Sequence, residues 1–110
     1  LHINAVGSYQ PEMCEIPEAT VARALVVVDS RAACLAEAGD LIQPIERGLI
    51  EESHIHAEIG EVAAGTGEGR TAEEQITLFK SVGNAVQDLA AASRALARAE
   101  QLGLGVEVSL

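Results

Sequence analysis

The run LVVVD, residues 25–29, constrains the fold more than any other stretch of this sequence. Its four consecutive apolar residues, three of them β-branched, favour a strand that is apolar on both faces. Such strands occur where helices cover both faces of a parallel sheet. Aromatic residues make up only 2% of the chain, so the core must consist of Val, Ile, Leu and Ala. The run therefore predicts an α/β protein with a parallel sheet.

Two other apolar runs predict further strands of this sheet. HINAVG closes at Gly7, and ITLFK covers residues 76–80. We expect the three strands to run parallel and to be connected by right-handed crossovers. One edge of a three-stranded sheet would then be uncovered, which favours association with another chain or with a second copy.

Helices are expected between the first strands. Pro17 can open one helix, and Ser30 is the expected N-cap of the next, which Gly39 would end. Residues 40–48 predict a short helix that is broken near Pro44.

The segment HIHAEIGEVAAG predicts one more helix before the last strand. Ile55, Ile59 and Val62 recur in it at helical spacing. GTGEGRTAEE follows as a glycine-rich surface loop.

The longest helix is predicted after residue 81. Apolar and small residues recur there every three or four positions, and Gly103 is a suitable stop. GVEVSL, residues 105–110, then alternates apolar and polar residues, which predicts a half-buried strand. The chain is thus expected to be α/β, with a parallel sheet flanked by helices, a long C-terminal helix and a final strand.

Charge and composition exclude several classes of function. The net charge of −10 argues against nucleic acid or an anionic membrane as a partner. No apolar run approaches the roughly 20 residues that span a bilayer.

Cys14 and Cys34 lack the spacing of a redox or zinc motif, and we expect a reduced, cytoplasmic protein. His54 and His56 stand two residues apart on an expected helix, so we predict no metal site.

The ordered set HINAVG, VVVDS, EAGDLIQPI, GR and ITLFKSVGNAVQDLAAA closely resembles the ornithine cyclodeaminase/mu-crystallin family. That family contains NAD(P)-dependent enzymes that act on amino acids and cyclic imines. The resemblance implies a fragment with a partial Rossmann-like sheet. Residues 1–83 would form the second half of an NAD(P)-binding domain. Residues 84–110 would return to a substrate and dimerisation domain, in a protein expected to be a homo-oligomer.

The resemblance also implies a site at the end of the first strand. Val6 and Gly7 would contact the nicotinamide of NAD or NADP, and Ser8 is either a candidate proton donor or an ordinary turn serine. Tyr9 stands where ornithine-cyclising members carry an aspartate. This favours a ketimine reductase of the pyrroline-2-carboxylate type, acting on a small amino or imino acid. Ornithine cyclodeaminase and a non-catalytic binding or dimerisation module are the alternatives.

The second part of the expected site is the junction KSVG, residues 80–83. Ligands of α/β proteins bind where strand carboxyl ends and helix amino ends converge. Ser81 and Gly83 would face the nicotinamide carboxamide or a substrate carboxylate, or Ser81 would only cap the long helix. Lys80 is a candidate ion-pair partner, and Asp29 is expected to be a capping or loop residue.

Overall fold

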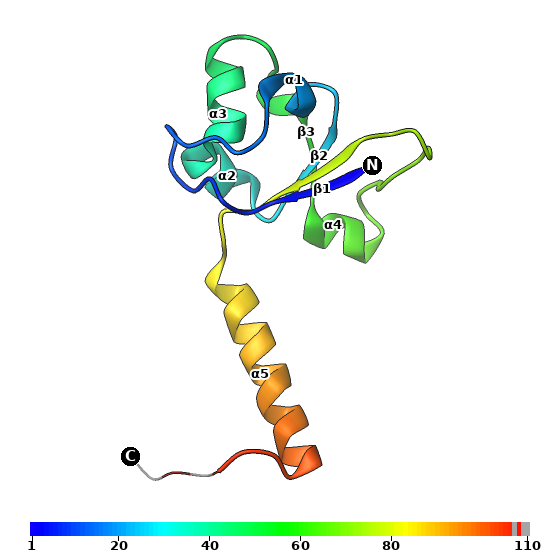
Figure 1. The fold of residues 1–110 in the computed structure, drawn as a ribbon. Helices are drawn as coiled ribbons and strands as arrows, with labels where there is room; N and C mark the ends of the chain where they lie inside the picture. The colour runs from blue at the N-terminus through cyan, green and yellow to red at the C-terminus, as the bar shows by residue number, and fades with distance from the viewer. Residues whose placement is uncertain (107, 109–110) are drawn as a thin grey trace.

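The computed structural model describes residues 1–106 and 108, and its centre is a parallel sheet of four strands. The strands are β1 (His2–Ala5), β2 (Leu25–Val28), β3 (Ile55–Glu58) and β4 (Thr77–Lys80). Their order is β1-β4-β2-β3, so the first and last strands in sequence lie side by side (Figure 1). The predicted α/β fold with a parallel sheet is confirmed.

Helices lie on both faces of this sheet (Figure 1). The described helices are α1 (Glu18–Val21), α2 (Arg31–Glu37), α3 (Gly39–Glu46), the 3-10 turn η1 (Glu52–His54), α4 (Ile59–Ala64) and α5 (Ala85–Leu102). Ser30 caps α2 as predicted, because its hydroxyl accepts a hydrogen bond from the amide of Ala33. α1, α2 and α3 cover one face, and α4 lies on the other (Figure 1).

The core lies between the sheet and the first three helices. Val26 and Leu78 are paired in the β2–β4 register and are 0% exposed. They pack with Val21, Cys34 and Leu41 from the helices, all of them buried. The core is built from aliphatic residues, as the shortage of aromatic residues required.

The opposite face of the sheet is only partly covered. Val27 and Phe79, next to the core residues in their strands, point to this side. With Ile59 and Val62 of α4 they line a hollow of about 230 Å³. Both faces are therefore apolar, which explains the continuous apolar run in β2.

The helix predicted over HIHAEIGEVAAG is wrong in its first half. Ile55–Glu58 forms β3, which pairs with β2, and α4 begins only at Ile59. Ile55 and Ala57 are each 2% exposed, whereas His56 between them is exposed. This alternation is typical of a strand. The sheet therefore has four strands instead of the three expected.

The boundary between α2 and α3 also differs from the prediction. α2 ends at Glu37, and Gly39 opens α3 instead of ending α2. A Cβ atom at Gly39 would lie 2.1 Å from the backbone oxygen of Met13, so glycine is needed for close packing. Pro44 lies inside α3 without breaking it.

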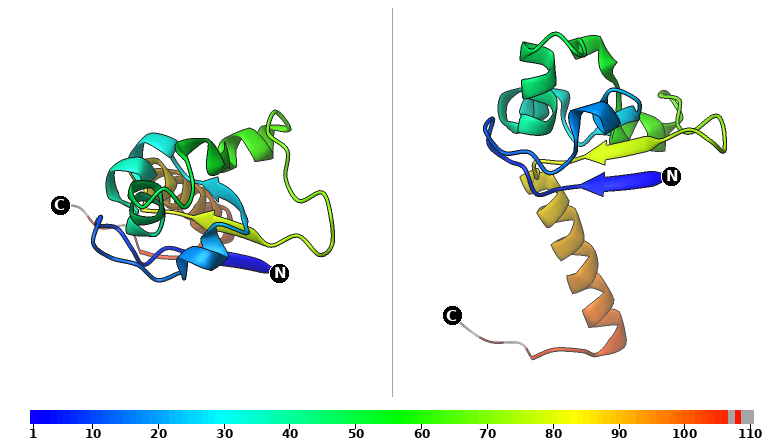
Figure 2. Two further views of the ribbon diagram at one scale, coloured as in Figure 1. Left: turned by 90° about the horizontal axis from the view of Figure 1, so that it is seen from above. Right: turned by 45° about the horizontal axis from the view of Figure 1, so that its top comes forward.

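α5 extends away from the rest of the molecule (Figure 2). Its residues Val86, Leu89 and Leu96 are 60–66% exposed. The radius of gyration is 17.2 Å, against about 13 Å for a compact chain of this size.

The strand predicted over 105–110 includes residues 107, 109 and 110, which lie outside the described residues, and it stays a prediction. Within the described part of the chain, no helix is long and apolar enough to cross a membrane.

Candidate functional site

The carboxyl ends of β1, β4 and β2 bring the segments of the expected site to one edge of the sheet. The amide of Ser81 donates to the carbonyl of Ala5 at 3.0 Å. The amide of Asp29 donates to the carbonyl of Lys80 at 3.2 Å. Residues 6–8, residue 29 and residues 81–83 are therefore neighbours, although they are far apart in sequence. We call this edge the carboxyl rim.

At the carboxyl rim, Asp29 binds the junction between β4 and α5. Its Oδ2 accepts hydrogen bonds from the hydroxyl of Ser81 at 2.6 Å and from the amides of Val82 and Gly83 at 3.2 and 3.0 Å. Its Oδ1 accepts from the amide of Ser30 at 2.8 Å. Burial raises the pKa of Asp29, but these hydrogen bonds outweigh it and hold the pKa below its ordinary value. Asp29 is thus the ionised loop residue that organises the junction.

The predicted alternative role of Ser81 as the helix cap is wrong. α5 begins three residues later than that prediction requires, and its N-cap is Asn84, whose side chain accepts from the amide of Val86 at 3.1 Å. Gly83 has a φ of 93°, which lets the chain turn between β4 and α5. Ser81 is 5% exposed, and its hydroxyl is directed to Asp29.

Lys80 lies beneath the carboxyl rim and is 0% exposed. Its Nζ is 3.4 Å from Oδ2 of Asp40 and 3.3 Å from Oε1 of Glu15. The side chain of Asp40 is also 0% exposed, whereas that of Glu15 is 34% exposed. The predicted ion-pair role of Lys80 is confirmed. Both of its partners were missed, because they come from other segments of the chain.

The loop after β1 presents two of its three expected site residues to solvent. Val6 is 66% exposed, and Gly7 beside it is also exposed. Ser8 is 1% exposed, and its hydroxyl donates a hydrogen bond to Oδ2 of Asp40. The amide of Gly7 donates to Oε1 of Glu15 at 2.7 Å. Val6 and Gly7 therefore form the surface of the carboxyl rim, and Ser8 anchors it from below.

The carboxyl rim differs in which of its polar groups are already paired. The backbone oxygens of Val6 and Gly7 accept no hydrogen bond within the described part of the chain, so they could accept from a carboxamide. The hydroxyl of Ser81 and the amides of Val82 and Gly83 are directed to Asp29. The sequence also lacks a dinucleotide fingerprint after a strand.

Neither cysteine has the character of a nucleophile. Cys34 is buried as predicted, and its Sγ is 3.3 Å from Oδ1 of Asp29. Burial and the hydrogen bond to Asp29 raise the pKa of Cys34 to about 12. Burial and the charge of Asp40 raise the pKa of Cys14, which is exposed in the loop after β1. A thiol with a raised pKa is mostly protonated at neutral pH and reacts slowly.

His54 and His56 contact backbone groups. His54 lies in η1 and His56 in β3, so the helix assumed for them is wrong. Their Nε2 atoms lie 2.9 Å from the carbonyl oxygens of Val21 and Glu68 respectively. The described residues contain no group of His, Cys, Asp and Glu side chains that could hold a metal ion.

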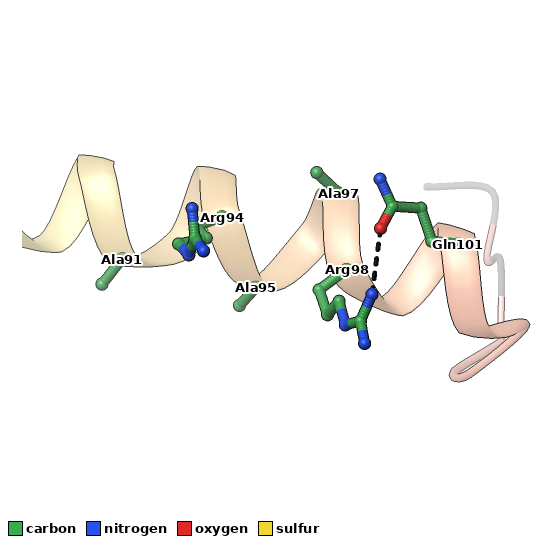
Figure 3. A pocket seen from close by; sticks show the side chains of 6 residues that line it. All are labelled: Ala91, Arg94, Ala95, Ala97, Arg98 and Gln101. Carbon is green, nitrogen blue, oxygen red and sulfur yellow. Dashed lines mark hydrogen bonds between the residues drawn. The ribbon is translucent and has the colours of Figure 1, made fainter.

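A second hollow, of about 700 Å³, lies along α5 and away from the carboxyl rim (Figure 3). It is lined by Ala91, Arg94, Ala95, Ala97, Arg98 and Gln101. All six come from one helix, which cannot enclose a ligand. The hollow therefore marks an uncovered helix face and not a second site.

Comparison with known proteins identifies the family of this chain. Residues 1–102 match the sequence profile of the ornithine cyclodeaminase/mu-crystallin family. The chain belongs to this family. The Delta(1)-pyrroline-2-carboxylate reductase of Bacillus cereus is 46% identical to it over 109 residues, which cover 98% of this chain and 34% of that protein.

Solved structures show the same likeness. The Delta(1)-pyrroline-2-carboxylate reductase of Thermococcus litoralis, in complex with NADH and L-proline, is 44% identical with a TM-score of 0.87. The match covers 97% of this chain and 33% of that one. An archaeal alanine dehydrogenase dimer with bound NAD is 34% identical with a TM-score of 0.81, over 99% of this chain and 34% of that one. The chain thus spans about a third of the length of these relatives.

Proposed function

We propose that this chain forms the nicotinamide side of an NAD(P)-dependent reductase that acts on small cyclic imino acids of the pyrroline-2-carboxylate type. The observation that carries this proposal is the carboxyl rim, where Val6 and Gly7 are exposed at the end of β1. Two relatives support it, since the 46% identical protein is a pyrroline-2-carboxylate reductase and the structure with a TM-score of 0.87 holds NADH and L-proline.

The proposed domain arrangement assigns residues 1–83 to the second half of the NAD(P)-binding domain. Residues 84–110 then lead back to a substrate and dimerisation domain of a longer protein. The relatives are about three times as long as this chain, which supports the arrangement. The exposed apolar residues of α5 support it too, because they need a covering surface. A homo-oligomer is proposed by analogy with the archaeal alanine dehydrogenase dimer.

The chain's own contribution to the reaction is positional. When bound, NADH or NADPH supplies the hydride that reduces the imine carbon. Val6 and Gly7 would form one wall of the ring site and exclude water from it. Ser81 and Gly83 would shape the opposite wall, held in place by Asp29. Ser8 remains a candidate proton donor, and to act it would have to leave its hydrogen bond to Asp40.

Kinetics of the full-length protein test this proposal. Oxidation of NADH and NADPH would be followed by absorbance with pyrroline-2-carboxylate, piperideine-2-carboxylate and ornithine. We expect cofactor oxidation with at least one cyclic imino acid. Ammonia release from ornithine without net cofactor consumption would instead assign an ornithine cyclodeaminase. Cofactor binding without any turnover would assign a non-catalytic binding protein.

The isolated chain offers a second test. It should bind NADH weakly or not at all, because the phosphate cradle would come from the first half of the domain. Tight binding by residues 1–110 alone would contradict the proposed domain arrangement. A cytoplasmic location and the lack of nucleic-acid and membrane partners stay predictions.

A further inference from the structure

The buried charges beneath the carboxyl rim have no part in the function proposed so far. Lys80 is 0% exposed between the carboxylates of Asp40 and Glu15. A buried ammonium is costly unless carboxylates pair with it, and apolar side chains can fill the same space as well or better. Stability alone therefore does not explain the cluster. Its hydrogen bonds and ion pairs fix the positions of particular groups, which apolar side chains cannot do, and this favours a role in positioning.

Asp40 binds the loop of residues 6–16 at both ends. Its Oδ1 accepts hydrogen bonds from the amides of Glu15 and Ile16 at 2.8 and 2.9 Å. Its Oδ2 accepts from the hydroxyl of Ser8 at the other end of the loop. One buried carboxylate thus draws the two ends of the loop together.

The middle of the same loop rests on the start of α3. A Cβ atom at Gly39 would lie 2.5 Å from the backbone oxygen of Pro11 and 2.9 Å from that of Gln10. These contacts are independent of the charges. They hold the loop against the body of the protein along its length.

Glu15 connects this buried cluster with the surface of the carboxyl rim. Its Oε1 accepts from the amide of Gly7 at 2.7 Å and lies 3.3 Å from Nζ of Lys80. A Cβ atom at Gly7 would lie 2.3 Å from Oε2 of Glu15. The carboxylate of Glu15 therefore lies directly against the peptide of Gly7.

We propose that Glu15 is a positioning residue for the reaction. Braced by Lys80, it fixes the peptide of Gly7 and so holds the wall formed by Val6 and Gly7 against the nicotinamide. This inference rests on the proposed function. Glu15 touches no reacting atom, and its effect passes through the backbone of Gly7.

Three variants of the full-length protein test the proposal. Glu15→Met keeps the length of the side chain and removes the acceptor, whereas Glu15→Gln keeps an acceptor oxygen. Glu12→Ala is the matched control, because Glu12 is an exposed acid in the same loop. Lys80 retains Asp40 in every variant, so that the buried ammonium stays paired. Glu15→Ala replaces Glu15→Met if circular dichroism shows that the latter is unfolded.

The readouts separate ring positioning from general damage. They are kcat/KM for pyrroline-2-carboxylate and the dissociation constants of NADH and of ADP-ribose, which lacks the nicotinamide. We expect Glu15→Met to lower kcat/KM roughly tenfold or more, the scale of a lost hydrogen bond to a charged group. Its affinity for NADH should fall while that for ADP-ribose stays within about twofold of wild type. Glu15→Gln should recover kcat/KM to within about threefold, and Glu12→Ala should match wild type.

Several outcomes would overturn the inference. They are a Glu15→Met protein with the kcat/KM of wild type, a Glu15→Gln protein as impaired as Glu15→Met, and equal losses of affinity for NADH and ADP-ribose. A wild-type protein that binds NADH but reduces no imino acid would refute the reductase function alone. The ratio of NADH to ADP-ribose affinity in Glu15→Met would then still decide the role of Glu15.

Discussion

The sheet with its helices, residues 1–83, and helix α5 both carry regular apolar patterns, but their apolar side chains differ in exposure. Val26 and Leu78 of the sheet are 0% exposed, whereas Val86 and Leu89 of α5 are 60% and 66% exposed. Helices of the same chain cover the sheet, while α5 extends away from it (Figure 2). An apolar pattern determines the kind of element that forms. Burial in addition requires a partner that lies nearby in space.

The two regions also differ in how they use charge. The sheet region buries Lys80 with Asp40, and Asp29 binds the junction beside them. In α5, Arg98 bonds to Gln101 at 3.3 Å on an exposed surface. Buried charges influence stability strongly because the low dielectric strengthens each interaction, whereas exposed ones are screened by water. Substitutions of buried residues in 1–83 should therefore have large effects, and substitutions in α5 should have small ones.

The largest effect is expected from Lys80→Met, which leaves Asp40 buried without its cation. We expect the free energy of unfolding to fall by about 3–5 kcal/mol, as for other broken buried pairs. Urea denaturation measures this change. Arg94→Met in α5 is the control and should change stability by less than about 0.5 kcal/mol. Similar effects of the two substitutions would remove the contrast between the regions.

A matched pair of leucine truncations should give the next largest difference. Leu78→Ala removes a fully buried side chain from the core and should cost about 2–5 kcal/mol. Leu89→Ala, at a residue that is 66% exposed in α5, should cost less than about 0.5 kcal/mol in this chain. Denaturation of both variants measures the difference. In the full-length protein, a large loss for Leu89→Ala would show that another surface covers α5.

Asp29→Asn tests the junction between the two regions through its pH dependence. Hydrogen bonds from Ser81 and neighbouring groups overcome the effect of burial and lower the pKa of Asp29 below 3.8. The ionised form therefore stabilises the folded chain above that pH, and this contribution is lost as the pH falls through the lowered pKa. Denaturation of wild type and variant between about pH 6 and pH 2.5 should show a stability difference that shrinks only in acid. A difference independent of pH would contradict the role of Asp29.

The smallest effect is expected from Asn84→Ala, which removes the N-cap of α5. The helix should lose about 1 kcal/mol of local stability, and its helicity by circular dichroism should fall. The midpoint of global unfolding should not move, because α5 contributes no residue to the buried core. Asn84→Asp, which keeps a capping acceptor, is the control. A lowered midpoint for Asn84→Ala would show that α5 supports the sheet.

Several elements could be predicted from local sequence. The apolar runs predicted β2 and β4, and Ser30 and Gly103 were correctly expected at helix ends. β3 was missed because the apolar residues of its segment fit both the helical and the strand spacing. Ile55 and Ile59 match a helix, whereas Ile55 and Ala57 match a strand. Pairing with β2 decides between them, and this contact is not local.

The sequence predicted the surface residues of the candidate site but not the buried residues beneath them. The resemblance predicted Val6 and Gly7, and the strand-to-helix junction predicted Ser81 and Gly83. The structure brings these residues together at the carboxyl rim. The partners beneath them were not predicted. The sequence around Asp40 shows only an acidic residue between a glycine and two apolar residues, which does not indicate burial. Nothing in the sequence connects Asp40 with Lys80, its ion-pair partner 40 residues later.

The sequence by itself determined the α/β class, the aliphatic core and the family, because these depend on runs and motifs that neighbouring residues define. Only the tertiary structure decided the fourth strand, the cluster of Lys80, Asp40 and Glu15, and the direction of the Ser81 hydroxyl. Each of these depends on atoms that meet across the parallel sheet after long crossovers. The energies of such contacts arise only when the chain has folded.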